Sequence, residues 1–201
     1  MRVILEGNIG SGKTTLTDAL RAPYPDAQIH SEAVGNWQDL LELFYATPSQ
    51  WALPLSLQVL LSHHVYRAVP PETMYILERC PLSCRHVFTQ LLFNDGTMPQ
   101  HHWDLFRQFA DELGWEPTAT DLILYIDTPV DVCLERITAR ARRGEEHIDV
   151  HYLRRLEFQY ANMLKFCACP VVRVDGTKPA HVLAADAVRA IQGALVTKKK
   201  A

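Results

Sequence analysis

A glycine-rich segment near the start of the sequence constrains the fold more than any other feature. Residues 7–15, GNIGSGKTT, follow an apolar run at residues 2–6 and match the pattern GxxxxGK followed by threonine at every fixed position. In this context the glycines let the backbone turn its N–H groups inward, where they and the N-terminus of the following helix bind an anion. The segment therefore predicts a buried strand, a phosphate-binding loop and a helix in direct succession.

Segments with the apolar pattern of strands alternate with segments of helical periodicity along the whole sequence. The predicted strands lie at residues 2–6, 28–32, 73–79, 121–127 and 170–175. The helices predicted after the first one lie at residues 39–46, 50–67, 81–93, 100–113, 128–143, 149–166 and 178–196. Helices between strands imply parallel pairing with right-handed crossovers. We therefore predict one domain over residues 1–201, a three-layer, doubly wound α/β fold with five parallel strands.

The composition excludes several classes of function. A net charge of −3 over 201 residues gives no sign of the basic surface that binds nucleic acid. No apolar run approaches the ~18 residues of a membrane span, and the early first strand leaves no room for a targeting peptide. The five cysteines lack the spacing of a zinc site, and reduced thiols are typical of the cytoplasm. We expect a cytoplasmic protein without nucleic-acid or membrane partners.

The glycine-rich loop predicts the binding of a nucleoside triphosphate. Lys13 is expected to reach the β- and γ-phosphates, and the Thr14 hydroxyl is expected to bind Mg²⁺. ATP and Mg²⁺ are therefore the expected cofactors. The predicted nucleotide-binding residues are Gly7, Asn8, Ile9, Gly10, Ser11, Gly12, Lys13, Thr14 and Thr15.

The arginine-rich segment at residues 136–147, RITARARRGEEH, predicts a lid that closes over a transferring phosphate. Helical spacing would place Arg136, Arg140 and Arg143 on one face, with Arg142 beside them. Guanidinium groups suit a charge that is spread over several phosphate oxygens. A GTPase would need a guanine-reading NKxD motif, which the sequence lacks. The loop and the lid together favour a small-molecule kinase.

Three segments resemble the deoxynucleoside kinase family, which includes mitochondrial thymidine kinase and the deoxycytidine and deoxyguanosine kinases. They are EGNIGSGKTT (6–15), EAVGNW (32–37) and ERCPLSCRHVF (78–88), and residues 40–54 and 121–146 also resemble the corresponding family segments. The resemblance implies transfer of the γ-phosphoryl group of ATP to the 5′-hydroxyl of a deoxynucleoside. It also implies a homodimer and feedback inhibition by a deoxynucleoside triphosphate.

The resemblance assigns catalytic roles to residues that follow two predicted strands. It makes Glu32 the general base for the 5′-hydroxyl, and this position lies at the carboxyl edge where α/β sheets bind ligands. The proline that usually follows this glutamate in the family is Ala33 here. The resemblance also implies that Arg79 contacts the Glu32 carboxylate and the reacting 5′ oxygen. The predicted catalytic residues are Glu32, Lys13, Arg79, Arg140 and Arg142, and the predicted metal ligands are Thr14 and Glu78.

Further positions match residues that bind the nucleoside in the family. The resemblance implies that Trp37 and Phe88 line and stack on the base, a task suited to aromatic rings. Tyr45 matches the tyrosine that binds the 3′-hydroxyl of the sugar. Alignment places Glu145 at the glutamate that shares this task, and the adjacent Glu146 is an alternative.

The residues expected to read the base depart from the family pattern. Ser56 stands where the family has glutamine, and the nearest glutamine is Gln58. Either Ser56 reads the base through a water, or a shift of the helix turns Gln58 inward, or Gln58 points outward without a role. The small, uncharged Cys84 favours a thymidine-accepting kinase, whereas His63, at a second selectivity position, is most simply a hydrogen-bonded helix histidine. We predict a pyrimidine deoxynucleoside as the substrate.

Two alternatives use the same loop. A thymidylate or other nucleoside monophosphate kinase needs a cation for the acceptor's own phosphate, and residues 33–37 contain no arginine. A nucleotide sensor would bind the triphosphate without catalysis and has no use for a base at Glu32 near Arg79. The residues therefore favour a nucleoside kinase over both.

Overall fold

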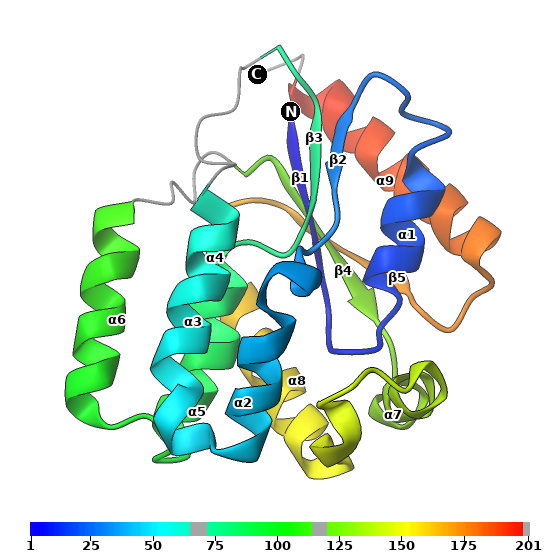
Figure 1. Cartoon of the computed structure of the whole chain (residues 1–201). Coiled ribbons are helices and arrows are strands. Elements are labelled where there is room, and N and C mark those ends of the chain that lie inside the picture. The colour runs from blue at the N-terminus through cyan, green and yellow to red at the C-terminus, as the bar shows by residue number, and fades with distance from the viewer. Residues whose placement is uncertain (65–71, 114–119, 199–201) are drawn as a thin grey trace.

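Five parallel strands form one sheet in the computed structural model, which describes residues 1–64, 72–113 and 120–198 (Figure 1). The strands are β1 (Arg2–Glu6), β2 (Gln28–His30), β3 (Tyr75–Glu78), β4 (Leu122–Asp127) and β5 (Val171–Asp175). Their order is β2-β3-β1-β4-β5, and every pairing is parallel. All predicted strands are present, some shorter than predicted, and the five-stranded parallel α/β fold is confirmed.

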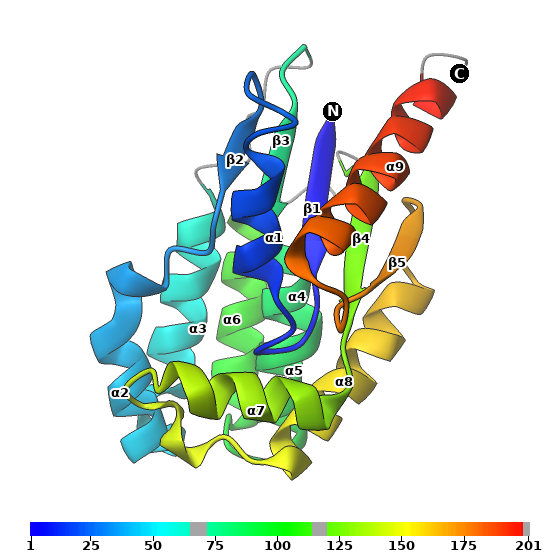
Figure 2. The same ribbon diagram turned by 90° about the vertical axis from the view of Figure 1, so that its right-hand side faces the viewer.

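Helices cover both faces of this sheet (Figure 2). Helices α1 (Lys13–Leu20) and α9 (Ala180–Lys198) pack together on one face, and α8 (Val150–Lys165) lies on the other with the helices between β3 and β4. The remaining helices are α2 (Gln38–Ala46), α3 (Pro48–His64), α4 (Pro81–Ser83), α5 (Gln90–Asn94), α6 (Gln100–Leu113) and α7 (Val130–Arg140). Residues 65–67, at the end of the helix predicted for 50–67, lie outside the described residues. Among the helices described, none combines the length and apolar character needed to cross a membrane.

The first strand is buried along its whole length, because both faces of the sheet are covered. Val3 and Leu5 pack against Leu16 of α1 on one face, whereas Ile4 packs with Leu77 on the other. This arrangement holds β1 at the centre of the sheet, between β3 and β4. The loop after β1 therefore lies beside the end of β3, where the strand order reverses and α/β folds bind their ligands.

The helix predicted for residues 81–93 is regular only at its ends. Its middle, Cys84–Thr89, is a π-helix between α4 and α5. A π-helix bonds residue i to i+5, so each turn contains more residues than an α-helical turn, and such segments often mark functional sites. The wider turn brings Cys84, Phe88 and Thr89 to the same pocket. Helical periodicity alone does not reveal this change.

Candidate active site

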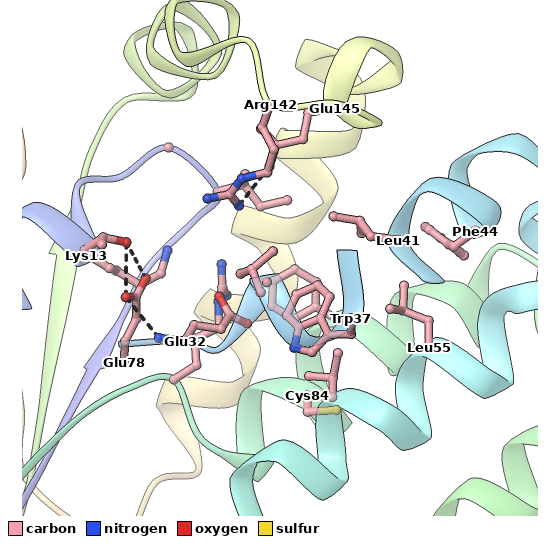
Figure 3. A pocket seen from close by; sticks show the side chains of 18 of the residues that line it. Lys13, Glu32, Trp37, Leu41, Phe44, Leu55, Glu78, Cys84, Arg142 and Glu145 are labelled. Atoms are coloured by element: carbon pink, nitrogen blue, oxygen red, sulfur yellow. Dashed lines mark hydrogen bonds and ion pairs between the residues drawn. The ribbon is translucent and has the colours of Figure 1, made fainter. Parts of the chain in front are cut away.

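A pocket of about 640 Å³ opens at the carboxyl edge of the sheet (Figure 3). One side is formed by the phosphate-binding loop. The lid contributes Arg136 and Arg140 from the end of α7, and Arg142 and Glu145 from the segment that follows it. The opposite end is largely apolar and is formed by α2, α3 and the π-helix. Glu32 and Arg79 lie between these regions. The predicted residues that line the pocket are Ile9, Gly10, Gly12, Lys13, Thr14, Thr15, Glu32, Trp37, Tyr45, Ser56, Glu78, Arg79, Cys84, Phe88, Arg140, Arg142 and Glu145.

The loop between β1 and α1 has the backbone that a phosphate cradle requires. Gly10 and Gly12 have positive φ angles of 77° and 100°. A Cβ atom on Gly10 would lie 2.4 Å from the Cys133 carbonyl oxygen, so only glycine fits. The three predicted loop residues that do not line the pocket brace it from behind: Gly7 lies against Ile126, Asn8 Nδ2 donates to the Leu153 carbonyl oxygen at 2.9 Å, and the Ser11 carbonyl oxygen accepts from Thr128 at 3.0 Å.

Lys13 is buried at the start of α1, and its ammonium group lies over the loop. Its Nζ donates to the carbonyl oxygens of Gly7 at 3.0 Å and Asn8 at 2.7 Å. Burial, together with the nearby Arg79 guanidinium, lowers the pKa of Lys13 to about 8. A cradle of glycine backbone with a lysine at the helix N-terminus fits the phosphates of a nucleoside triphosphate.

Thr14 and Glu78 bring three oxygen atoms together beside the loop. The Thr14 hydroxyl contacts the two carboxylate oxygens of Glu78 at 3.0 and 3.1 Å. Glu78 also accepts a hydrogen bond of 3.3 Å from the backbone N–H of Glu32. Hydroxyl and carboxylate oxygens are hard ligands, and Mg²⁺ is commonly held by one or two carboxylates together with substrate phosphates. The donor set therefore fits a magnesium ion shared with the phosphates.

Glu32 and Arg79 form a buried ion pair in the middle of the pocket. Arg79 Nε donates to Glu32 Oε2 at 3.0 Å, and the side chains are 6% exposed for Arg79 and 13% for Glu32. Burial favours a higher pKa for Glu32, but the charges of Arg79 and Lys13 outweigh it and lower this pKa below its ordinary value. Glu32 is therefore ionised at neutral pH, as a general base must be.

Arg79 has a left-handed backbone conformation, with a φ angle of 66°. This conformation is unfavourable for a residue other than glycine, and such residues cluster at active sites. The backbone N–H of Arg79 still donates to the Leu5 carbonyl oxygen at 2.9 Å. The guanidinium lies 4.5 Å from the centre of the Phe88 ring and also donates to the Tyr160 hydroxyl. Neither Tyr160 nor its partner Glu6 is predicted from the sequence as a site residue.

The lid differs from the predicted single helix. Helix α7 ends at Arg140, and Ala141 has a left-handed φ of 47°. The prediction that Arg136, Arg140 and Arg143 share one helical face is therefore wrong. Arg143 lies beyond the helix end and is 83% exposed, where it pairs with Glu42 at 3.2 Å.

The other lid arginines face the pocket. Arg140 binds Glu145 through two contacts of 2.8 and 2.6 Å, and Arg142 contacts the same carboxylate at 3.4 Å. Arg136 donates to the Ser11 carbonyl oxygen at 3.3 Å, which ties α7 to the phosphate-binding loop. Glu145 is buried and lines the pocket, whereas Glu146 is exposed. The geometry therefore favours Glu145 over Glu146 for a contact with the substrate.

Tyr45 reaches the pocket from α2, next to the lid. Burial and the neighbouring Tyr152 and Glu145 raise the pKa of its hydroxyl, so the phenol stays protonated. A protonated phenol can donate a hydrogen bond, and the Glu145 carboxylate can accept one. Together they suit a ligand hydroxyl, which both donates and accepts.

The far end of the pocket is apolar and contains Trp37, Leu41, Phe44, Leu55 and Cys84 (Figure 3). Ser56 and His63 line it from α3, because residues seven apart lie on the same side of a helix. Gln58, two residues from Ser56, is half-buried and lies outside the pocket lining. Ser56 therefore faces the pocket, and the structure contradicts the possibility that a shift of the helix turns Gln58 inward.

The expectation of a hydrogen-bonded helix histidine at His63 is contradicted at one of its two ring nitrogens. Its side chain is buried, yet Nε2 has no hydrogen-bond partner among the described residues. Burial lowers its pKa to about 4 although Glu32 acts in the opposite direction, so the imidazole is neutral. Trp37 Nε1 is another buried polar atom without a partner in the described part of the chain. Both residues line the pocket, so a ligand can supply the missing partners.

Sequence similarity to known proteins extends over most of the chain. The family model described as deoxynucleoside kinase matches residues 3–192. A protein of Invertebrate iridescent virus 3, whose name mentions a kinase and no substrate, is 34% identical over 189 residues, 93% of this chain and 94% of that protein. Mitochondrial thymidine kinase 2 of Homo sapiens is 30% identical over 160 residues, 75% of this chain and 59% of that protein. Deoxycytidine kinase 2 of Gallus gallus is 25% identical over 199 residues, 81% of this chain and 73% of that protein.

Proposed function

Because the chain belongs to the deoxynucleoside kinase family, we propose that it transfers the γ-phosphoryl group of ATP to the 5′-hydroxyl of a pyrimidine deoxynucleoside. Family membership makes it an ATP-dependent kinase of deoxynucleosides. The site residues, the Mg²⁺ ion, the choice of base and the assembly are the parts that we add. We treat residues 1–201 as one functional domain.

The observation that carries the proposal is the Glu32–Arg79 pair between the phosphate-binding loop and the apolar end of the pocket. A 5′-hydroxyl beside Glu32 gives its proton to this carboxylate as its oxygen attacks the γ-phosphorus. The new bond joins the 5′-oxygen to phosphorus, and the bond that breaks leaves ADP. Arg79, Lys13 and the loop N–H groups stabilise the charge on the transferring group.

Arg140 and Arg142 complete this set from the lid, where they also hold Glu145. Thr14 and Glu78 would hold Mg²⁺, which neutralises phosphate charge when it is bound. The protein's contribution to catalysis is then mainly positioning and electrostatic stabilisation.

The nucleoside occupies the other end of the pocket in this proposal. Tyr45 and Glu145 bind the 3′-hydroxyl, and Trp37 and Phe88 flank the base. The small Cys84 side chain leaves space for a substituent on a pyrimidine ring. Relatives named for thymidine and for deoxycytidine both match the chain, so we propose that pyrimidines in general are accepted.

We also propose that the enzyme is a cytoplasmic homodimer. The cysteines Cys80, Cys84, Cys133, Cys167 and Cys169 are all free thiols, which suits a reducing compartment. Leu61 on α3 and Leu105 and Phe109 on α6 are exposed apolar side chains on two helices that pack together. Such side chains are candidates for burial between subunits. Light scattering coupled to size-exclusion chromatography measures the mass directly, and a monomer at micromolar concentration would contradict the dimer.

A substrate panel tests the function. The pure protein is incubated with ATP and Mg²⁺, and ADP release is followed with each deoxynucleoside and with thymidine monophosphate. We expect turnover of thymidine and deoxycytidine, and none of the monophosphate. Turnover of the monophosphate without turnover of thymidine would contradict the proposal, and turnover of purine deoxynucleosides alone would overturn the choice of base.

A further inference from the structure

We propose that Glu6 and Tyr160 are positioning residues that hold Arg79 in its reactive orientation through a buried chain of hydrogen bonds. The inference rests on the proposed role of Glu32 as the general base, because Arg79 is the residue that orients the Glu32 carboxylate. Glu6 is the last residue of β1, and Tyr160 belongs to α8. The chain therefore links the central strand, a distant helix and the reacting end of the pocket.

The contacts join Glu6 to Glu32 without a break, and Arg79 donates toward both ends. The Tyr160 hydroxyl donates to Glu6 Oε2 at 3.2 Å, and it accepts a hydrogen bond from Arg79 Nη1. The Nε atom of the same guanidinium donates to Glu32 at 3.0 Å. The second oxygen of Glu6 accepts from the Cys80 thiol at 3.4 Å, so both carboxylate oxygens are used.

These polar residues are buried as deeply as the apolar core. Glu6 and Tyr160 are 0% exposed and Arg79 is 5% exposed. A buried carboxylate and a buried phenol hydroxyl cost free energy unless each finds polar partners. Phenylalanine would fill the space of Tyr160 without that cost. The phenol is therefore explained by the Arg79 guanidinium that it binds, and the Glu6 carboxylate by the Tyr160 hydroxyl that it holds.

The Arg79 backbone alone does not fix the orientation of its side chain. The residue has a left-handed φ of 66° directly after β3, and a long side chain that leaves such a turn can adopt several orientations. One guanidinium nitrogen binds Glu32, another binds Tyr160, and the plane lies 4.5 Å from the Phe88 ring. Phe88 meets Tyr160 edge to face with ring centres 6.3 Å apart. The same chain thus couples the residue that flanks the base to the residue that orients the catalytic carboxylate.

The substitution Tyr160→Phe tests the chain with little change in volume. We expect kcat to fall on the order of 100-fold, because a small misplacement of a catalytic group has effects of this size. The KM for ATP should stay close to that of the wild type, since a contact that acts on the transition state alone lowers kcat without raising KM. The melting temperature should fall, because the buried Glu6 Oε2 loses its partner, so kcat is measured well below the melting temperature of each variant. Tyr24→Phe is the matched control, because the Tyr24 hydroxyl contacts the Val188 carbonyl oxygen in the opposite layer of the fold.

Two substitutions of Glu6 separate hydrogen bonding from space filling. Glu6→Gln keeps a carbonyl oxygen that can accept from Tyr160, so it should retain most of the activity. Glu6→Leu removes both acceptors and should match the loss in Tyr160→Phe. Wild-type kcat in Tyr160→Phe, or equal activity of the two Glu6 variants, would overturn the inference. A loss of kcat that disappears when the three variants are assayed well below their melting temperatures would do so too.

The variant Glu32→Gln, measured in the same assay, keeps the inference separate from the function on which it rests. Activity that survives in Glu32→Gln would contradict the proposed base itself. If Glu32→Gln is inactive and Tyr160→Phe is fully active, the proposed function is supported, and the proposed role of Glu6 and Tyr160 is contradicted.

Discussion

The two ends of the pocket differ in how their polar groups are satisfied. At the phosphate end, Lys13, Glu32 and Arg79 have hydrogen-bond or ion-pair partners within the protein. Thr14 and Glu78 also contact one another there. At the apolar end, the buried atoms Trp37 Nε1, His63 Nε2 and Thr89 Oγ1 have no partner among the described residues. Ser11 Oγ, behind the phosphate-binding loop, is the exception at the other end.

This difference separates polar groups that the protein itself holds in place from polar groups whose hydrogen-bond partner must come from the ligand. A buried donor or acceptor without a partner costs about 1–3 kcal/mol, so it persists where binding can recover that free energy. Preorganised groups, by contrast, reach the reaction already in place and need little rearrangement. We infer that the phosphate end sets the reaction, while the apolar end sets which nucleoside is accepted.

The strongest test of the phosphate end is Glu32→Gln. We expect kcat to fall by about 10²–10⁴-fold, because general-base catalysis contributes on that scale. ATP affinity, measured by calorimetry, should not change, since Glu32 lies on the acceptor side of the loop. The matched control is Glu146→Gln, which alters an exposed glutamate in the lid. Comparable losses in both variants would show that charge in general, and not this carboxylate, supports the reaction.

The lid arginines give the next largest effect. We expect Arg140→Ala to lower kcat by about 10²-fold, the scale of losing one donor to a developing charge. Arg140 also holds the buried Glu145 with contacts of 2.6 and 2.8 Å, so the KM for the nucleoside should rise. Arg143→Ala is the control, because Arg143 is 83% exposed and such pairs contribute about 0–1 kcal/mol to stability. Steady-state kinetics measured for both variants test whether only the inward-facing arginines act. Equal losses of kcat in Arg140→Ala and Arg143→Ala would contradict this.

The same contrast explains what the sequence could predict. The meeting of Lys13, Thr14 and Glu78 in the pocket could be predicted. Each of them stands in a recognisable sequence pattern at or just after the end of a strand. The hydrogen bond between Tyr160 and Glu6 joins residues that are 154 positions apart, and no local pattern marks it. The only local sign at this position is a carboxylate directly after the three apolar residues of a buried strand.

The incorrect predictions have physical causes of the same kind. Arg143 was expected beside Arg136 because periodicity assumes an unbroken helix, whereas the left-handed Ala141 ends it. His63 was expected to be hydrogen-bonded, but its partners depend on how α3 packs against the π-helix at Cys84–Thr89. Motif-bound residues were therefore predictable, and residues whose surroundings depend on tertiary packing were not.

At the apolar end, His63→Leu should change which base is preferred. A neutral imidazole can donate or accept a hydrogen bond according to its tautomer, so it can serve either thymine or cytosine. Loss of this group should change the ratio of kcat/KM for thymidine to that for deoxycytidine by about 10-fold. Gln58→Leu is the control on the same helix, because Gln58 lies outside the pocket lining. A ratio that moves with Gln58 and not with His63 would reverse the assignment of the base-facing side.

The smallest expected effect is a pH dependence of stability that also originates at His63. Burial, together with the positive charge of Arg79, lowers the pKa of the imidazole from 6.5 to about 4 in the folded protein, although Glu32 acts in the opposite direction. The unfolded chain therefore binds more protons between pH 6.5 and 4, and the free energy of unfolding falls as the pH decreases through this window. Between pH 7 and 5.5 we expect His63 to account for about 1 kcal/mol of the decrease. Urea unfolding should show this part of the decrease in the wild type and in the exposed control His151→Leu, but not in His63→Leu. An identical decrease in all three proteins would mean that His63 is hydrogen-bonded or solvated in solution, and the contrast between the two ends of the pocket would then rest on Trp37 and Thr89.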